Sequence, residues 1–209
     1  MTGTATKGLK ADGDVIVSDD AINSSSHMYI KGGDVTVVAT DNDGLDSNGN
    51  LYISGGVIRA FGTSSPECGI DANEEDGYSV IFTGGTLLAV GGSNSTPRTS
   101  ESTQPYVSGS MSVSAGNEIT LKSGDTVLAT FTVPDNYSSS NQGGGPGGWG
   151  APVNACPGGP GGGGWGGSSV LISCAGLTSG SSYTITSGTS SSTVTATTTG
   201  NGGGGGRPW

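Results

Sequence analysis

The sequence has few basic residues, no long apolar run and no helical pattern. Lysine and arginine number 7 among 209 residues against 17 aspartate and glutamate, which gives a net charge of −10 at pH 7. Such an acidic chain repels nucleic acid and anionic membrane surfaces, and it attracts cations. No apolar run approaches the roughly 20 residues that cross a bilayer, and no signal peptide follows Met1. We therefore expect no nucleic-acid partner and no membrane span.

The chain is also poor in apolar residues and rich in glycine. Hydrophobic residues make up 31% of the sequence, and 42 residues are glycine. This composition excludes a broad globular core, but it allows a core that is one or two side chains wide. No stretch places apolar residues at the 3.6-residue spacing of a helix, whereas short alternating segments bounded by Gly, Asn, Asp and Ser occur throughout. The sequence predicts an all-β protein.

An internal repeat organises the first half of the chain, with 23 residues from Ile22 to Leu45 and 25 from Leu45 to Ile70. Each unit has a corner that begins with an apolar residue, a strand that ends in Gly-Gly and a second short strand. The third unit carries four extra residues within 74–77. A partial unit precedes these, in which Val15 takes the position of Met28. This period, with two or three short strands per turn, is typical of a β-solenoid.

Alternation along the repeat predicts which side chains point inward. Each is expected to stack on its equivalent about 4.8 Å away in the next coil, so that the stacked columns form the whole core. The expected columns are Ile22, Leu45, Ile70; Met28, Leu51, Val80; Ile30, Ile53, Phe82; Val35, Ile58, Leu87; and Val37, Ala60, Ala89. The Gly-Gly pairs supply the positive φ that a corner between strands requires.

The repeat ends before Ser93, and most of the acidity ends with it. The part before Ser93 carries 13 acidic and 4 basic residues, whereas the rest carries 4 and 3. We expect parallel repeats over residues 1–98 and a C-terminal β region over 99–209, with a Gly/Pro-rich insert at 141–168 and a glycine-rich tail. Strands are expected at 111–113, 118–122, 127–133, 170–174 and 183–186. A disulfide between Cys156 and Cys174, which an oxidising compartment would allow, leaves Cys68 over.

Several strings in the repeat resemble a family of bacterial secreted carbohydrate-binding β-helix proteins. They are GLKADGD at 8–14, DDAINS at 19–24, DGLDS at 43–47, YISGG at 52–56 and GIDA at 69–72. The resemblance is strong over residues 6–92 and weaker from 105 to 188, and the Gly-rich insert departs from the family. It implies a right-handed parallel β-helix similar to pectate lyases, calcium in the corners, an extracellular or cell-surface location, and binding of cellulosic or acidic, pectin-like plant polysaccharides.

Carboxylates recur at the corner of each unit. In stacked coils they would lie along one edge about 5 Å apart, where like charges repel. Ca²⁺ cancels this repulsion and accepts six to eight oxygens, whereas Mg²⁺ demands a tighter octahedral geometry. The alternative is a solvated acidic edge, because Asp and Asn favour turns in any case. The calcium ligands that we expect are Asp19, Asp20, Asn23, Asp41, Asp43, Asp46, Glu67 and Asp71.

Aromatic side chains on the repeats are candidates for sugar binding. Tyr29 and Tyr52 take equivalent outward positions one coil apart. Aromatic faces pack against sugar C–H groups while tyrosine hydroxyls form hydrogen bonds. A tyrosine ladder that only stabilises the sheet is the alternative. Arg59 also alternates outward, where it could meet a sugar carboxylate. The expected carbohydrate-binding residues are Tyr29, Tyr52, Arg59 and Phe61.

Catalysis has little support in the sequence. His27 has no Ser or Cys partner that the sequence suggests, and we interpret it as a surface residue. Cleavage of acidic glycans by elimination needs a strong base near calcium, for which Lys10, Lys31 and Arg59 are the candidates. Paired carboxylates for glycoside hydrolysis are present in excess, but stacked corner aspartates suit a metal better than an acid and a nucleophile.

These observations predict a non-catalytic, calcium-dependent protein that binds a polysaccharide outside the cell. Two alternatives remain open. Open ends of stacked strands can join copies of the chain, which would make it a structural subunit of an extracellular fibre or filament. A polysaccharide lyase is the other alternative.

Overall fold

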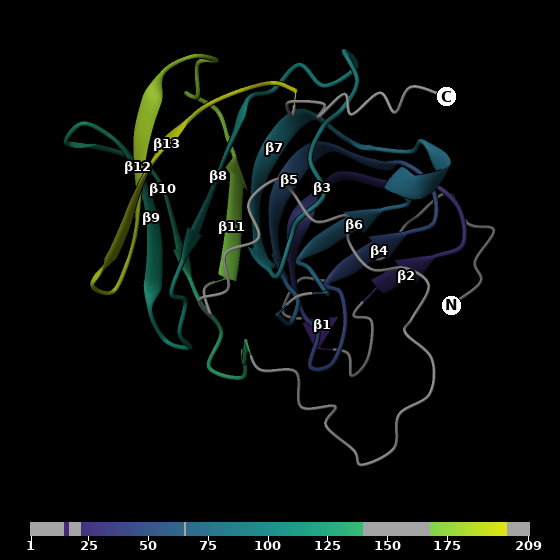
Figure 1. Cartoon of the computed structure of the whole chain (residues 1–209), viewed down its shortest axis with the longest axis horizontal. Coiled ribbons are helices and arrows are strands. Elements are labelled where there is room, and N and C mark those ends of the chain that lie inside the picture. Colours follow the sequence, from purple (N-terminus) through teal and green to yellow (C-terminus); the bar gives the residue numbers. More distant parts are fainter. Residues whose placement is uncertain (1–14, 17–21, 65, 140–167, 200–209) are drawn as a thin grey trace, which may run out of the picture.

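The protein is all-β, as the sequence predicts. The computed structural model describes residues 15–16, 22–64, 66–139 and 168–199. Thirteen strands of this part form three sheets of six, four and three strands, and one 3₁₀ turn, η1 (Glu74–Asp76), interrupts them. In Figure 1 the three-stranded sheet lies at the right, the six-stranded sheet in the middle and the four-stranded sheet at the left. Within the described ranges, no helix has the length and apolar character needed to cross a membrane.

Two of the sheets are built from the repeat, because each unit contributes one strand to each sheet. The three-stranded sheet pairs β2 (Ile22–Ser24), β4 (Leu45–Ser47) and β6 (Ile70–Ala72) in parallel. In the six-stranded sheet, β3 (Met28–Val38), β5 (Leu51–Phe61) and β7 (Val80–Gly91) pair in parallel in the same order. The four extra residues of the third unit form η1 and the Gly77 that ends it.

The register of these strands is the one that the repeat predicts. Leu45 lies between Ile22 and Ile70, and the other four columns pair in the same coil-by-coil order. Met28 and Ile30 are half-buried at the outer edge, and the members from later strands are buried. One core cluster contains Val35, Val37, Leu45, Leu51, Ile53, Ile58, Ala60, Ile70, Val80, Phe82, Leu87 and Ala89. A narrow apolar core is thus sufficient because each side chain packs on its own equivalent.

The Gly-Gly pairs turn the long strands through a corner. The second glycine of each pair has a positive φ, which is 95° at Gly33, 90° at Gly56 and 85° at Gly85. A Cβ atom on Gly56 would also lie 2.6 Å from the carbonyl oxygen of Gly33. Both the backbone conformation and the close approach of neighbouring coils therefore require glycine at this position.

The partial first unit pairs differently from the prediction. Strand β1 (Val15–Ile16) pairs in parallel with Val37 and Val38, near the end of β3. The repeat pattern predicts that Val15 lies beside Met28 instead. This unit lacks the Gly-Gly strand that turns the other coils, so its apolar spacing alone does not specify which half of β3 it joins.

The predicted architecture, a right-handed parallel β-helix followed by a strand-rich region, is wrong. The strands form three separate sheets, and the largest is mixed, with the order β1-β3-β5-β7-β11-β8. Strand β11 (Ser168–Ser173) pairs antiparallel with β7, and β8 (Tyr106–Met111) pairs antiparallel with β11. A repeat reports how its own units stack, but it contains no signal for the strand that joins the last unit. The predicted regions 1–98 and 99–209 therefore share one sheet.

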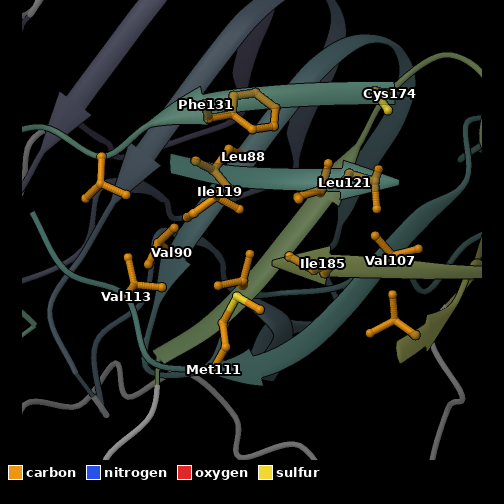
Figure 2. Packing of buried hydrophobic residues seen from close by; sticks show 14 of the residues in the cluster. Leu88, Val90, Val107, Met111, Val113, Ile119, Leu121, Phe131, Cys174 and Ile185 are labelled. Atoms are coloured by element: carbon orange, nitrogen blue, oxygen red, sulfur yellow. The ribbon is translucent and has the colours of Figure 1, made fainter. Parts of the chain in front are cut away.

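The remaining strands form an antiparallel sheet that covers the outer face of the mixed sheet. Its order is β10 (Thr126–Thr132), β9 (Glu118–Ser123), β12 (Ser182–Ser187) and β13 (Ser190–Thr195). Strand β13 and most of β8 were not predicted, since runs of Ser, Thr and Gly carry little apolar alternation. Figure 2 shows Leu88 and Val90 of β7 facing Ile119, Leu121 and Phe131 of this sheet. The second core of the protein lies between these two layers.

A loop caps the last parallel strand, β6, where a fourth coil would otherwise stack. The Asn94 side-chain oxygen accepts hydrogen bonds from Gly69 N at 2.8 Å and Ile70 N at 3.2 Å. Its amide nitrogen donates to the carbonyl oxygen of Ser169, 3.1 Å away in β11. Ser95 N donates to the carbonyl oxygen of Ile70 at 3.0 Å. The edge of β6 is thereby satisfied, and the loop ties the parallel strands to the antiparallel ones.

Candidate functional site

Tyr29 and Tyr52 form a stacked pair on the surface of the repeats. Their Cα atoms are direct partners in β3 and β5, and their ring centroids lie 4.7 Å apart with an interplanar angle of 3°. This separation is the spacing of neighbouring strands. Tyr29 is 55% exposed, while Tyr52 is half-buried because Tyr29 covers one of its faces. The predicted equivalence of the two tyrosines is confirmed, and the pair offers one accessible aromatic side chain together with the edge of a second.

Further side chains gather around this pair. The ring of His27 is roughly perpendicular to the rings of Tyr29, Tyr52 and Tyr78, at centroid distances of 6.4, 6.2 and 5.5 Å. The Lys31 ammonium lies 5.7 Å from the centroid of Tyr29. We call these five side chains the tyrosine platform. It combines aromatic surface, hydroxyl groups and one cation on an acidic protein, a combination suited to a ligand with C–H faces and oxygen atoms.

Phe61 does not belong to the platform, and its predicted role in sugar binding is wrong. It is fully buried and packs against Tyr137 with ring centroids 5.3 Å apart. The outer face of β5 at this end lies beneath the antiparallel sheet, as part of the second core. Alternation correctly pointed Phe61 away from the first core, but it could not reveal that a second layer covers that face.

Arg59 lies on the far side of the Gly55-Gly56 corner from Tyr52. Its guanidinium forms an ion pair with Asp34 and a 3.4 Å hydrogen bond with the Thr36 hydroxyl, both on the neighbouring strand β3. A sugar carboxylate at Arg59 would have to compete with Asp34. The structure therefore places Tyr29 and Tyr52 together and places Arg59 in a separate pair.

Four of the predicted calcium ligands lie at the corners and are buried. The exposed fractions of Asp43, Asp46, Glu67 and Asp71 are 4, 8, 8 and 5%. Asp46 and Asp71 are direct partners in β4 and β6. Asp43 Oδ1 accepts a 2.6 Å hydrogen bond from Cys68 N, and Asp71 Oδ1 accepts a 2.9 Å bond from the Ser95 hydroxyl. We call these four groups the corner carboxyls.

Burial and mutual repulsion disfavour the charged form of these groups. Desolvation raises the pKa of Asp43 to about 8, the Cys68 hydrogen bond opposes the shift, and nearby Asp71, Glu67 and Asp46 add to it. Desolvation likewise raises the pKa of Asp71 to about 6, against the hydrogen bond from Ser95. Burial and the neighbouring carboxyls therefore disfavour ionisation of Asp43 and Asp71, and bound protons or a cation would relieve this repulsion.

The donor chemistry of the corner carboxyls fits calcium, which prefers oxygen ligands. Their positions do not form a closed coordination shell, because no three His, Cys, Asp or Glu side chains in the described residues converge as a metal-binding group. Asp41 is exposed and bonded by the Thr40 hydroxyl at 3.1 Å. Asp19 and Asp20 lie outside the described residues, and of Asn23 only the backbone pairing with Asp46 is described.

The predicted disulfide between Cys156 and Cys174 is wrong. Cys174 is a free thiol with 3% exposure, packed within the second core (Figure 2), and burial raises its pKa. Cys68, which the prediction left over, is disulfide-bonded. Cys156 lies outside the described residues, as do positions 141–167 of the Gly/Pro-rich insert and the glycine-rich tail. Spacing along the chain could not reveal that Cys174 faces a core.

Sequence reasoning missed Asn50 and undervalued His27. Both residues occupy the same position of the repeat, directly before Leu51 and Met28, and Ser79 takes that position before Val80. These three polar residues form a column next to the tyrosine pair. A column of polar side chains at one repeat position was the available signal.

Comparison with known proteins gives no further guidance, because no family model, curated protein or solved structure matches the chain. Function is therefore inferred from the platform and the corner carboxyls.

Proposed function

We propose that the protein binds a plant-type polysaccharide outside the cell, without catalysis and in a calcium-dependent way. The observation that carries the proposal is the stacked Tyr29–Tyr52 pair, with Tyr29 more than half exposed and Lys31 beside its ring. Large exposed aromatic side chains are unusual on an acidic, serine-rich surface, where polar residues would serve solubility better. A sugar chain offers C–H faces to the aromatic rings and oxygens to the hydroxyls and the ammonium.

Calcium would act on the site through the corner. The corner carboxyls would supply oxygens to the ion, and the ion would offset the repulsion that their burial intensifies. The segment from Asp46 to Tyr52 runs directly from the corner strand β4 into the platform strand β5. A corner held together by the ion would thus keep the tyrosine pair in register, so calcium would increase affinity without contacting the sugar.

The test is binding to insoluble cellulose and to pectin, measured by depletion of protein from solution in calcium and in chelator. The double variant Tyr29→Ala/Tyr52→Ala should lose most binding, since each aromatic contact contributes on the order of 1 kcal/mol, or about fivefold in affinity. Val127→Ala is the matched control, because Val127 is 52% exposed but lies on the antiparallel sheet. Unchanged binding by the tyrosine double variant would refute the platform as the site.

The fibre alternative has no supporting observation of this kind. A second copy could stack onto the last repeat only if the outer edge of β7 were unpaired. Strand β11 pairs with that edge from Leu87 to Gly91. For the lyase alternative, Lys10 lies outside the described residues and Arg59 is engaged by Asp34, which leaves Lys31 of the tyrosine platform as the candidate base.

A further inference from the structure

Asn50 joins three parts of the platform through its own polar atoms. Its backbone N–H donates to His27 Nδ1 at 2.9 Å, and its side-chain nitrogen lies 2.8 Å from the Tyr52 hydroxyl oxygen. Its side-chain oxygen accepts from Ser79 N at 2.8 Å. In two of these three hydrogen bonds the donor is a backbone N–H, which cannot accept. The direction of all three bonds follows from this.

The bond from Ser79 determines how the Asn50 amide is oriented. A backbone N–H can only donate, so the atom that faces Ser79 must be the amide oxygen. The amide nitrogen therefore faces Tyr52, and since it has no acceptor lone pair it must donate to the hydroxyl oxygen. The Tyr52 hydroxyl is consequently an acceptor on the protein side. Its own proton is left to point toward a ligand.

The same reasoning determines the tautomer of His27. The N–H of Asn50 requires a lone pair on Nδ1, so the neutral imidazole carries its proton on Nε2. The close approach of the ring depends on Gly49, because a Cβ atom there would lie 2.6 Å from Nδ1. His27 is exposed, and its ring lies beside three tyrosines, so its N–H borders the surface on which a ligand would rest.

We propose that Asn50 is a positioning residue that makes the platform a surface of hydrogen-bond donors, so that the bound ligand presents acceptor oxygens to it. The donors are the Tyr52 O–H, the His27 Nε2–H and the Lys31 ammonium. The matching groups on a polysaccharide are ether oxygens of the ring and the glycosidic bond, or a carboxylate. This inference rests on the proposed function for the nature of the ligand, but the orientation of the donors stands on the geometry of the free protein.

The tautomer can be measured without any ligand. The chain has one histidine, so the imidazole nitrogen signals in a ¹⁵N NMR spectrum of the full chain belong to His27 without further assignment. At a pH where the ring is neutral, we expect a protonated Nε2 and an unprotonated Nδ1. A proton on Nδ1 would overturn the proposal, because Asn50 could not then donate to that atom.

Whether the Tyr52 hydroxyl donates its proton toward the ligand can be tested with a double-mutant cycle on polysaccharide binding. In the wild-type background, Tyr52→Phe should weaken binding about fivefold through the lost donor. Asn50→Asp keeps an oxygen for Ser79 but turns the second amide position into an acceptor, which draws the Tyr52 proton inward. In that background Tyr52→Phe should change binding less than twofold. Equal effects of Tyr52→Phe in the two backgrounds would overturn the role of Asn50.

Tyr78→Phe is the matched control, since its ring borders His27 but makes no described hydrogen bond with Asn50. Its effect should be the same in both backgrounds. A uronic-acid oligosaccharide and its carboxyl-reduced counterpart then identify the acceptor: binding of both indicates ether oxygens, and binding of the acid alone indicates the carboxylate. If wild-type protein binds neither these nor cellulose, the proposed function and the ligand part fail, while the NMR result still decides whether Asn50 orients the donors.

Discussion

The parallel strands of residues 22–91 and the antiparallel strands of residues 106–195 build their cores in different ways. In the first region each apolar side chain packs on its own counterpart in the next coil, as Leu45 does on Ile70. In the second region the side chains of two layers face each other, as Ile119 and Phe131 face Leu88. The two regions are joined because β7 belongs to both cores.

The difference also governs where charge can be buried. Among the residues that the structure describes, the five buried acidic ones, Asp43, Asp46, Glu67, Asp71 and Glu74, all belong to the parallel region. Stacking of like units brings like charges together, whereas antiparallel strands of unrelated sequence do not. Glu74 is compensated by an ion pair with Arg98 from the capping loop. Within the described residues, buried carboxyls are thus confined to the parallel region, where a cation would offset the repulsion between neighbouring acidic groups.

The largest loss of stability is expected when a charged side chain is placed inside a stacked column of the first core. Leu45→Asp would bury a carboxylate beside Ile70, which costs several kcal/mol and should unfold the parallel region. Because β7 is shared, the antiparallel region should unfold in the same transition. Circular dichroism melting and limited proteolysis would report this. A protease-resistant fragment of the antiparallel strands would show that the two regions are independent after all.

A smaller effect is expected from pH in the absence of divalent cations. Asp43 and Asp71 have folded pKa values of about 8 and 6, against 3.8 as the ordinary value. Between these values the folded protein binds more protons than the unfolded chain, so stability should fall as pH rises from about 4 to 8. The loss should be on the order of a few kcal/mol. Melting temperatures measured in chelator at pH 5 and pH 8 would show it.

Calcium should remove much of this pH dependence by favouring the ionised carboxyls at pH 8. Asp43→Asn should do so without calcium, because the amide cannot ionise, and it should also reduce the response to calcium. Identical melting curves for wild type and Asp43→Asn over this pH range would contradict two claims: that ionisation of Asp43 destabilises the folded protein, and that the corner carboxyls bind calcium.

The capping loop should contribute less to the free energy of unfolding than a core column does, but more than a surface hydrogen bond does. Asn94→Ala would leave Gly69 N without its acceptor and break the link to Ser169, at a cost of about 2–4 kcal/mol. Asn73→Ala is the control, since it removes a side-chain cap of η1 in the same region and should cost about 1 kcal/mol. Chemical denaturation would measure both. Equal losses would show that Asn94 does not join the two regions.

The smallest effect is expected on the outer face of the antiparallel sheet. Ser191, Thr186, Thr120 and Thr130 form a row of cross-strand neighbours there. Thr186→Ala should cost about 0.5 kcal/mol, as exposed cross-strand pairs do. Its buried neighbour Ile185 supplies the contrast, because Ile185→Ala should cost about 2–5 kcal/mol. A larger loss at Thr186 than at Ile185 would show that this face is covered.

Part of the functional site could be predicted in the same way as the columns. The equivalence of Tyr29 and Tyr52, and of Asp46 and Asp71, follows from one repeat period, and the structure places both pairs side by side. The repeat period also places His27 beside Asn50, but the hydrogen bond from Asn50 N–H to His27 Nδ1 could not be predicted, because spacing does not specify how the imidazole ring is turned. The roles expected of Phe61 and Cys174 failed because a layer from a distant part of the chain covers them.

The sequence by itself determined the register of the parallel strands, the glycine corners and the all-β character of the chain. These depend on the period of apolar residues and on backbone freedom at Gly33, Gly56 and Gly85, which are local properties. Only the tertiary structure decided that β11 closes the edge of β7, that the corner carboxyls are buried, and that Asn50 orients Tyr52 and His27. Each of these depends on which strand or loop meets a surface from elsewhere in the chain, and an edge or a face accepts many partners through the same backbone hydrogen bonds or apolar contacts.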